Sequence, residues 1–483
     1  MEQQRIPKAG LLPFYLKLYD DLLPACRDGF TGYAQRIRTG LEARGVAVAT
    51  APVCRVAEEF KASIRRFEQE GADCIVTLHL AYSPSLEALD AFCETSLPVV
   101  ILDATMDAGF GCDASPDRIM YNHGVHGVMD FASMLRRRRR PFEIVAGHDA
   151  DPRVLDRVAD DVRAAVAAGA LRGSRVLRVG NTFAGMGDFY VEEDVLAAKL
   201  GINVTQIGLD TLDEAVLAVT DGDVAGEVAA DRERFTCELP AEAHERSVRV
   251  GLGLRRVLEE GEYDAFSVNF QAFDRADRPS GTMPFFEISK AMGRGLGYGG
   301  EGDVLTAALV GALARAFGAV TFTEIFCADW AGNSLFLSHM GEISPSVAGD
   351  TPRVISKPFF MGGSLDPAVL TCAAKPGPAV FVNLTPGPDD TFSLIVAPVE
   401  VLAEEASLDP AMRDMVRVWV RPHGEVAPFL EAYSRAGGTH HSALVLGGHA
   451  AAIAAFGRMC GLEVVLLESR AKRVMPFVEG ERK

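Results

Sequence analysis

Hydrophobic and polar positions follow two alternating patterns over roughly the first 315 residues. Short apolar runs such as CIVTL (74–78), VVIL (99–102) and EIVA (143–146) have the length of buried strands, and stretches with the apolar spacing of helices separate them. This alternation predicts parallel sheets covered by helices. The pattern restarts at RVLRV (175–179), directly after a glycine-ended helix, so we expect a domain boundary near residue 170.

From about residue 316 the pattern changes. Runs such as VTFTEIF (320–326), VFVNLT (380–385) and FSLIVAPVEVL (392–402) indicate strands with few helices between them, which favours an antiparallel β domain. A chain of 483 residues is also too long for one hydrophobic core. We therefore expect three domains, at residues 1–170, 171–315 and 316–483, with a frayed charged tail at the end.

The charge balance argues against nucleic acid as a partner. The chain has 66 acidic and 48 basic residues, a formal net charge of −18, and such a surface repels phosphate backbones and anionic lipid. The run Arg136–Arg140 is the exception, and a nucleic-acid or localisation patch is one interpretation of it. A solvated helix end or a subunit contact is the interpretation that we favour.

The cysteines and the apolar runs indicate in which cellular compartment the protein is expected. The nine cysteines are odd in number and never spaced as Cys-x-x-Cys, which fits a reducing compartment and predicts a cytoplasmic protein. The beginning of the chain lacks the pattern of a signal peptide. The apolar stretch 304–322 is interrupted by Arg315 and by glycines, so no membrane span is expected.

A glycine cluster, GLGYGG at 295–300, matches the pattern Gly-x-Gly-x-x-Gly of dinucleotide-binding folds. Its context argues against that function, because residues 285–295 read as a helix rather than a strand, and Glu301 would repel a pyrophosphate. A glycine-rich loop that presents Glu301 at the start of a helix over 303–317 is the better interpretation. An ordinary loop with a solvated glutamate is the alternative.

Three further segments carry candidate ligands. Glu324 interrupts an apolar strand-like run, where it is either buried with a compensating cation or placed at a strand edge. His339 is flanked by apolar and small residues, as many core histidines are. In the pair His440 and His441, an extended backbone would send the two rings to opposite faces, so that one of them reaches a given metal. Two carboxylates and two imidazoles suit Mn²⁺, Co²⁺, Fe²⁺ or Zn²⁺.

These segments together resemble the L-arabinose isomerase family. The resemblance rests on four motifs in that family's order, with supporting likeness over most of the chain: GYGGEGD (297–303), FTEIF (322–326), SHMGEISPSVA (338–348) and GGTHHS (437–442). It implies that Glu301, Glu324, His339 and His441 bind a metal, with Mn²⁺ expected and Co²⁺, Mg²⁺ or Fe²⁺ as alternatives.

The resemblance also implies a fold and an assembly. The fold is two Rossmann-like parallel-sheet α/β domains followed by a β-rich, antiparallel, barrel-like C-terminal domain, in agreement with the patterns above. The assembly is a homo-oligomer, a trimer or hexamer, in which the N-terminal domain of one subunit lends His126 to the site of its neighbour.

The activity that the resemblance implies is isomerisation of L-arabinose to L-ribulose, or of a related aldose such as D-galactose or L-fucose, through a cis-enediol. Glu301 and Glu324 would act as base and acid. Implied substrate contacts are Leu16, Lys17, Tyr82, His126, Met186, Phe270, Phe326 and His440. At Leu16, Lys17 and Ile325 this chain departs from the family pattern, which bears on the choice of sugar. The alternatives are a sugar-binding or regulatory paralogue without turnover, and an epimerase or isomerase of another sugar.

Overall fold

The computed structural model describes residues 5–359, 363–405 and 407–468, and the expected charged tail lies outside them. The N-terminal part is a parallel sheet of order β2-β1-β3-β4-β5. Its strands are β1 (Lys8–Phe14), β2 (Ala47–Thr50), β3 (Cys74–His79), β4 (Val99–Asp103) and β5 (Glu143–Ala146). Its α-helices are α1 (Lys17–Leu22), α2 (Thr31–Glu42), α3 (Ala57–Gln69), α4 (Ser85–Glu94), α5 (Ile119–Asn122) and α6 (Gly124–Arg137), with 3₁₀ turns at Pro24–Phe30 and Pro116–Arg118.

Helices cover both faces of this sheet, which is why its strands are continuous apolar runs rather than alternating ones. Leu12 and Phe14 of β1 pack against α3, α4 and α6, whereas Leu11 packs on the opposite side with α2 and α7 (Pro152–Arg172). All six residues of β3 are buried. The structure therefore confirms the α/β architecture expected for the first part of the chain.

The central part is a second parallel sheet, of order β10-β9-β6-β7. Its strands are β6 (Arg175–Val179), β7 (Asn203–Ile207), β9 (Ala265–Val268) and β10 (Gly297–Gly300). Its helices are α8 (Glu193–Leu200), α9 (Leu209–Leu217), α10 (Asp221–Arg234), α11 (Ala241–Glu260), α12 (Phe285–Gly293) and α13 (Val304–Phe317), with a 3₁₀ turn at Phe270–Ala272. The restart of the α/β pattern near residue 175 thus begins a new sheet.

The glycine cluster is the strand β10, not the loop that its composition predicts. A Cβ on Gly297 would lie 2.0 Å from the carbonyl oxygen of Ala307, and one on Gly299 would lie 2.3 Å from that of Asp303. Helix α13 therefore packs directly on the backbone of β10, an approach that only glycine permits. As expected, helix α12 precedes this strand, and Glu301 comes at its end.

The C-terminal part is a seven-stranded sheet of order β15-β18-β11-β12-β17-β16-β19, in which β15 also pairs with β16 and closes a barrel-like ring. Its strands are β11 (Val320–Asp329), β12 (Ser334–Ser338), β15 (Gly377–Pro386), β16 (Phe392–Val401), β17 (Val418–Pro422), β18 (His441–Leu446) and β19 (Glu463–Leu466). The pairings are antiparallel except between β16 and β19. This confirms the β-rich, barrel-like part.

Other C-terminal elements lie around the ring. The helices are α14 (Val426–Arg435) and α15 (Ala450–Met459), and 3₁₀ turns run at Pro345–Val347, Pro388–Asp390 and Pro410–Asp414. A small sheet joins β8 (Thr236–Glu238), which comes from the central part, to β13 (Arg353–Ser356) and β14 (Ala368–Thr371). The central and C-terminal parts therefore share backbone hydrogen bonds as well as a core.

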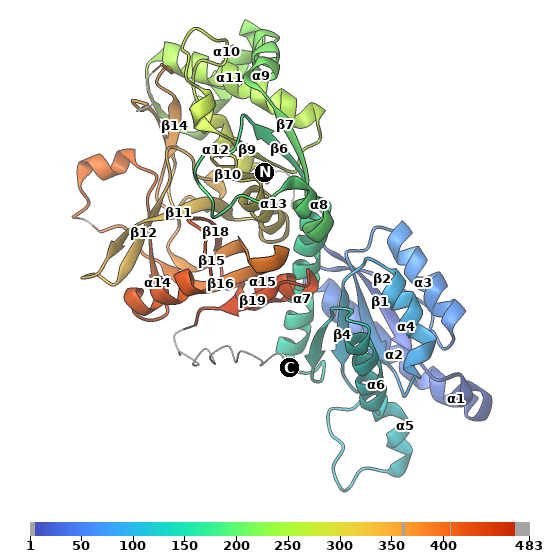
Figure 1. Cartoon of the computed structure of the whole chain (residues 1–483). Helices are drawn as coiled ribbons and strands as arrows, with labels where there is room; N and C mark the ends of the chain where they lie inside the picture. The colour runs from blue at the N-terminus through green and yellow to red at the C-terminus, as the bar shows by residue number, and fades with distance from the viewer. Residues whose placement is uncertain (1–4, 360–362, 406, 469–483) are drawn as a thin grey trace, which may run out of the picture.

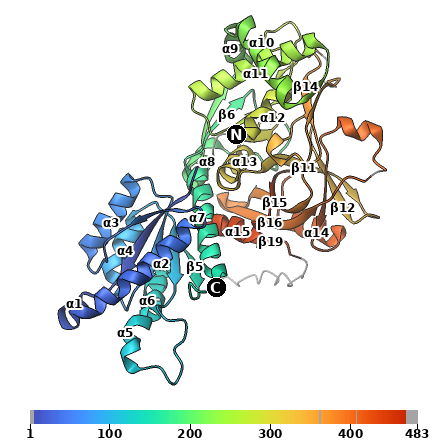
Figure 2. The same ribbon diagram turned by 180° about the vertical axis from the view of Figure 1, so that it is seen from behind.

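Helix α7 connects the N-terminal part to the rest of the molecule. It packs against α2 on one side and against α13 and α15 on the other, and its residues 164–168 are all buried. Figure 1 shows the N-terminal part on one side of α7 and the barrel on the other, and Figure 2 shows the same arrangement from behind. The boundary predicted at residue 170 falls in the last turn of this helix.

None of the helices in the described part of the chain has both the length and the apolar character that crossing a membrane requires.

Candidate metal centre and active site

Four strands position the four predicted ligands. Glu301 follows β10, and Glu324 lies within β11. His339 comes directly after β12, and His441 begins β18. In the register of the sheet, Glu324 pairs with Ser338 on one side and with His441 on the other, so β11 is an internal strand and Glu324 is not at an edge.

The ligand atoms of these residues converge in two overlapping groups that share His441. Glu324, His339 and His441 form one group and Glu301, His440 and His441 the other, and within each group the atoms lie within 4.8 Å of one another. The Nε2 atom of His339 lies 3.9 Å from Oε2 of Glu324, and Nε2 of His441 lies 3.8 Å from Oε2 of Glu301.

Unpaired buried atoms face one another in this cluster. Within the described ranges, Oε2 of Glu301, Nε2 of His440 and Nε2 of His441 are buried and have no hydrogen-bond partner. Leaving such groups unpaired is costly, and native proteins rarely do so without a ligand, ion or water. A divalent cation that takes oxygen and nitrogen donors fits this set of side chains.

Carboxylates behind the two deep histidines orient their rings. Nδ1 of His339 lies 2.6 Å from Oε1 of Glu342, and Nδ1 of His441 lies 3.1 Å from Oδ2 of Asp303. Both carboxylates are buried. A partner on Nδ1 fixes the ring and leaves Nε2 free for a metal, which is the arrangement typical of metal-binding histidines.

Asp303 has a second role in the local fold. Its Oδ1 accepts a hydrogen bond from the backbone N–H of Thr306 and so caps the N-terminus of α13. Glu301, two residues earlier, has a left-handed backbone with φ of 62°. Such strain in a residue other than glycine is common at functional sites. The turn thus presents Glu301 while α13 begins behind it.

His440 corrects the expectation that tandem histidines point to opposite faces. It lies in a bend before β18, so the alternation of a strand does not apply to it, and its Nε2 lies 3.7 Å from Oε2 of Glu301. Its Nδ1 lies 2.6 Å from Oδ2 of Asp188. Burial alone would lower the pKa of His440, but Glu301 and Asp188 outweigh it and raise the pKa to about 9.

The two glutamates have pKa values shifted in opposite directions. Burial alone would raise the pKa of Glu301, but the imidazoles of His440, His441 and His339 outweigh it, so the net shift is downward. For Glu324 burial is also the largest cause, and it raises the pKa because the same histidines compensate less. This difference in environment favours ionised Glu301 beside a more readily protonated Glu324.

Three of the predicted substrate contacts lie around this cluster. The ring of Phe326 lies 6.4 Å from that of His339. Phe270 is buried next to Phe183, whose backbone N–H donates to the carbonyl of Glu301. Met186 donates its backbone N–H to the carbonyl of Phe183, in the same loop. His440 is the fourth predicted contact here.

The remaining predicted contacts form a separate group on the N-terminal part. Leu16 directly precedes α1, and Lys17 is exposed with its Nζ 3.2 Å from Oδ2 of Asp21. The ring of Tyr82 lies 4.9 Å from that of His126, which is exposed on the first turn of α6. In Figure 1 the helices α1 and α6, which carry Lys17 and His126, lie on the other side of α7 from the strands β11 and β18. One chain does not bring the two groups together.

Sequence reasoning missed Asp188, Asp303 and Glu342. Asp303 and Glu342 lie within the motifs that carried the resemblance, whereas Asp188 lies outside them. Nothing in the spacing of the three indicates which histidine each would contact. On the N-terminal part it also missed the pair of Tyr19 and His123, whose Oη and Nε2 atoms are 3.0 Å apart.

Comparisons with known proteins place the chain in a family. Residues 175–317 match the profile of the L-arabinose isomerase central domain, and residues 319–463 match that of the L-arabinose isomerase C-terminal domain. The L-arabinose isomerase of Acidothermus cellulolyticus is 32% identical over 367 residues, covering 73% of this chain and 72% of that protein. That of Nocardioides sp. is 31% identical with the same coverage, and L-arabinose isomerase 1 of Bacillus licheniformis is 28% identical over 89% of this chain and 86% of its own length. The chain therefore belongs to the L-arabinose isomerase family and is an aldose–ketose isomerase.

Proposed function

We propose that this enzyme is a metal-dependent isomerase that interconverts L-arabinose and L-ribulose at the cluster of Glu301, Glu324, His339 and His441. The observation that carries the proposal is the convergence of two ligand groups on His441, with buried donor and acceptor atoms that lack partners. Two carboxylates and two imidazoles leave coordination positions for sugar oxygens.

Mn²⁺ is the ion that we expect, with Co²⁺, Mg²⁺ or Fe²⁺ as alternatives, because the donor set contains oxygen and nitrogen and no thiolate. When bound, the ion would withdraw electron density through the oxygens on C1 and C2 and so acidify the C–H bond at C2. Glu342 and Asp303 would hold the histidine rings in position before the ion binds, since each already bonds an Nδ1 atom.

The two glutamates divide the proton transfers. Glu301, whose pKa is lowered, removes the proton from C2 of the aldose, and Glu324, whose pKa is raised, donates a proton to the oxygen on C1. The product of this step is a cis-enediol. Glu301 then returns its proton to C1, and the oxygen on C2 gives its proton to Glu324, which yields the ketose and leaves each carboxyl group as it began.

The side chains around the cluster would bind the rest of the sugar. His440, held by Asp188, presents a charged N–H near Glu301 and suits a sugar hydroxyl. Phe326, Phe270 and Met186 supply apolar surface around it. The N-terminal group of Leu16, Lys17, Tyr82 and His126 would complete the site of a neighbouring subunit in a trimer or hexamer, because it does not reach the cluster of its own chain.

Leu16, Lys17 and Ile325 differ from the family pattern, so the preferred sugar has to be determined separately from the type of reaction. Leu16 has no polar side-chain atom that could form a hydrogen bond with a sugar hydroxyl. Each such hydrogen bond contributes strongly to the choice between substrates, so its loss changes which stereoisomer fits. D-Galactose and L-fucose are therefore the alternative substrates to compare with L-arabinose.

The test measures ketose formation from a panel of aldoses. Protein stripped with a chelator is supplied with Mn²⁺, Co²⁺, Mg²⁺ or Fe²⁺ and incubated with L-arabinose, D-galactose, L-fucose and D-ribose. We expect activity only after metal is restored, and loss of at least about a thousandfold in kcat for Glu324→Gln. The exposed Glu400→Gln on β16 is the matched control and should keep full activity.

Metal-independent turnover would contradict the assignment of the cluster, and absence of turnover with every sugar and every ion would favour the non-catalytic alternative.

A further inference from the structure

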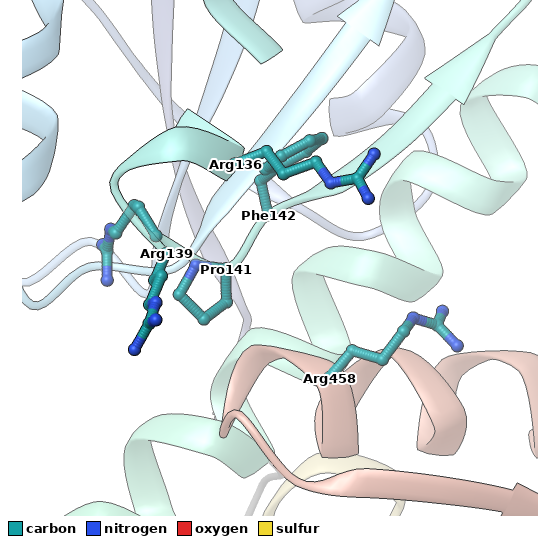
Figure 3. A pocket seen from close by; sticks show the side chains of 6 residues that line it. Arg136, Arg139, Pro141, Phe142 and Arg458 are labelled. Atoms are coloured by element: carbon teal, nitrogen blue, oxygen red, sulfur yellow. The ribbon is translucent and has the colours of Figure 1, made fainter. Parts of the chain in front are cut away.

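A small arginine-lined cavity lies between the N-terminal part and the C-terminal helix α15, in a region that the isomerase site does not use. Its volume is about 260 Å³, and it is lined by Arg136, Arg139, Arg140, Pro141, Phe142 and Arg458. Figure 3 shows side chains from the end of α6 and the segment before β5 on one side, and Arg458 of α15 on the other. Two distant stretches of the chain therefore build one concave surface.

The positive charge around this cavity is largely uncompensated. Arg458 forms a two-pronged ion pair with Glu143, with N–O distances of 2.8 and 2.7 Å. Over the described residues, the side chains of Arg136 and Arg139 have neither a hydrogen bond nor an ion pair. In a chain with a formal net charge of −18, such a cluster concentrates anions locally.

Arg140 adds a buried donor without a partner. One of its terminal nitrogens donates to the carbonyl of Leu97, but its buried Nε has no partner among the residues that the structure covers. Burial, and then the positive charge of Arg172, lower the pKa of Arg140. No carboxylate of the described residues is among the causes of this shift.

Arg139 occupies a position that favours glycine. It follows the C-terminus of α6 with φ of 55°, and the N–H of Arg140 closes the turn by donating to the carbonyl of Leu135. An arginine costs about 1 kcal/mol more than glycine in this conformation. The helix dipole accounts for basic residues in the last turn of α6, but it does not account for Arg139 beyond the turn or for Arg458 on another helix.

We propose that this cavity binds the phosphate group of a small phosphorylated metabolite, or free phosphate. Guanidinium groups bind phosphate oxygens through charge-assisted hydrogen bonds, and Arg136 and Arg139 offer such donors from one side. Arg458 adds its remaining Nη1 donor from the other side, since Glu143 holds its Nε and Nη2. The cavity is a shallow depression open to solvent, and its volume of about 260 Å³ is ample for a phosphate group.

The experiment compares two double variants of the full chain by calorimetric titration. Arg136→Gln with Arg139→Gln removes two lining charges, and Arg137→Gln with Arg138→Gln removes the same charge from the same turn without touching the cavity lining. All four side chains are exposed, so both proteins should fold, and thermal melting checks this. The probes are inorganic phosphate, D-ribose 5-phosphate and, as the uncharged match, D-ribose.

We expect one phosphate-bearing ligand to bind saturably per chain, and D-ribose not to bind at this cavity. The lining variant should lose affinity about tenfold or more, equivalent to ~1.4 kcal/mol. The control variant should stay within about twofold of the unmodified protein. Tighter binding of the ester than of inorganic phosphate would identify a metabolite as the ligand, and equal binding would identify free phosphate.

Three results would overturn the proposal: no saturable binding of either phosphate probe, equal losses in the two double variants, or a change of oligomeric state in the lining variant without anion binding. The last result, read from sedimentation velocity, would make the cavity a contact with an acidic surface of another subunit. None of these outcomes depends on turnover of a sugar, so the proposal is tested independently of the isomerase assignment.

Discussion

Glu342 illustrates how a single buried carboxylate prepares the candidate metal centre. It holds Nδ1 of His339 at 2.6 Å and also accepts the backbone N–H of Gly341. Replacing it with glutamine keeps the shape but removes the charge that strengthens the ring as a ligand. We expect Glu342→Gln to lower the affinity for Mn²⁺ by about 10- to 100-fold, measured by titration of the stripped protein.

The same titration distinguishes positioning from catalysis. With Mn²⁺ in excess, Glu342→Gln should regain most of its kcat, whereas Glu324→Gln should not, because Glu324 is proposed to transfer a proton. A Glu342→Gln protein with unchanged Mn²⁺ affinity would show that the ring of His339 is held by packing alone.

The pair of Asp188 and His440 makes stability depend on pH in the metal-free protein. Since the pKa of His440 rises from 6.5 to about 9 on folding, its contribution to stability is complete below about pH 6.5 and is lost as the pH rises through about 9. Asp188→Asn should therefore lower the melting temperature more at about pH 6 than at about pH 9.5. Equal shifts at both values would mean that the imidazole is uncharged at the lower pH.

The sequence indicated which residues are candidate ligands but not which side chains contact them. Glu301, Glu324, His339 and His441 were predicted as ligands because each stands in a motif that resembles a family. Asp303 was not, because an aspartate before a helix is explained by capping, and the cap is indeed present. Its contact with His441 joins residues 138 positions apart, and no local pattern indicates such a contact.

At the scale of elements, strand β10 is the feature on which the position of Glu301 depends. We expect Gly297→Ala to destabilise the protein by about 3 kcal/mol, because the added methyl group meets backbone atoms of α13 that cannot move aside. Chemical denaturation measures the change. Gly226→Ala in α10, where the added group meets no atom within 4 Å, is the control and should be neutral or slightly stabilising.

A loss of stability that is equal in the two glycine variants would indicate a general intolerance of alanine rather than a close contact between β10 and α13.

Most elements were predictable because their apolar spacing is a local property. The parallel α/β pattern before residue 315 and the strands after it were both predicted correctly. The strand of glycines was not, because glycine is usually a signal of turns, and its reason for being there is a helix that packs on it from later in the chain. The bend at His440 was also missed, since a pair of adjacent residues does not reveal where a strand begins.

At the scale of the whole molecule, the separation of His126 from the cluster predicts complementation between subunits. His126→Ala and Glu324→Ala proteins should each be inactive alone. When they are mixed and allowed to exchange subunits, some sites should combine an intact cluster with an intact His126 from the neighbour and regain activity. The assay is ketose formation before and after mixing.

Mixing two preparations of the same variant is the control for this experiment, and a mixture that stays as inactive as its components would place both residues in the site of a single chain or exclude a role for His126.

The apolar pattern alone does not predict how the parts are arranged. The barrel was expected only through the family resemblance, because its closure depends on the order of strands that are distant in sequence. The arginine run was recognised as an exception to the acidic composition, but Arg458 lies more than 300 residues further along the chain. The cavity that they share exists only because α15 packs on α7.

Helix α7 has a consequence for how this family can change during evolution. It joins the N-terminal part to the central sheet without a flexible linker, and its residues 164–168 are buried on all sides. Inserting or deleting one residue there would turn one end relative to the other by about 100° and shift it by about 1.5 Å. If neighbouring subunits complete each other's sites, such a change would misalign every site in the assembly at once. On that proposal, substitutions in α7 are tolerable one side chain at a time, whereas its length is fixed by the alignment of neighbouring subunits.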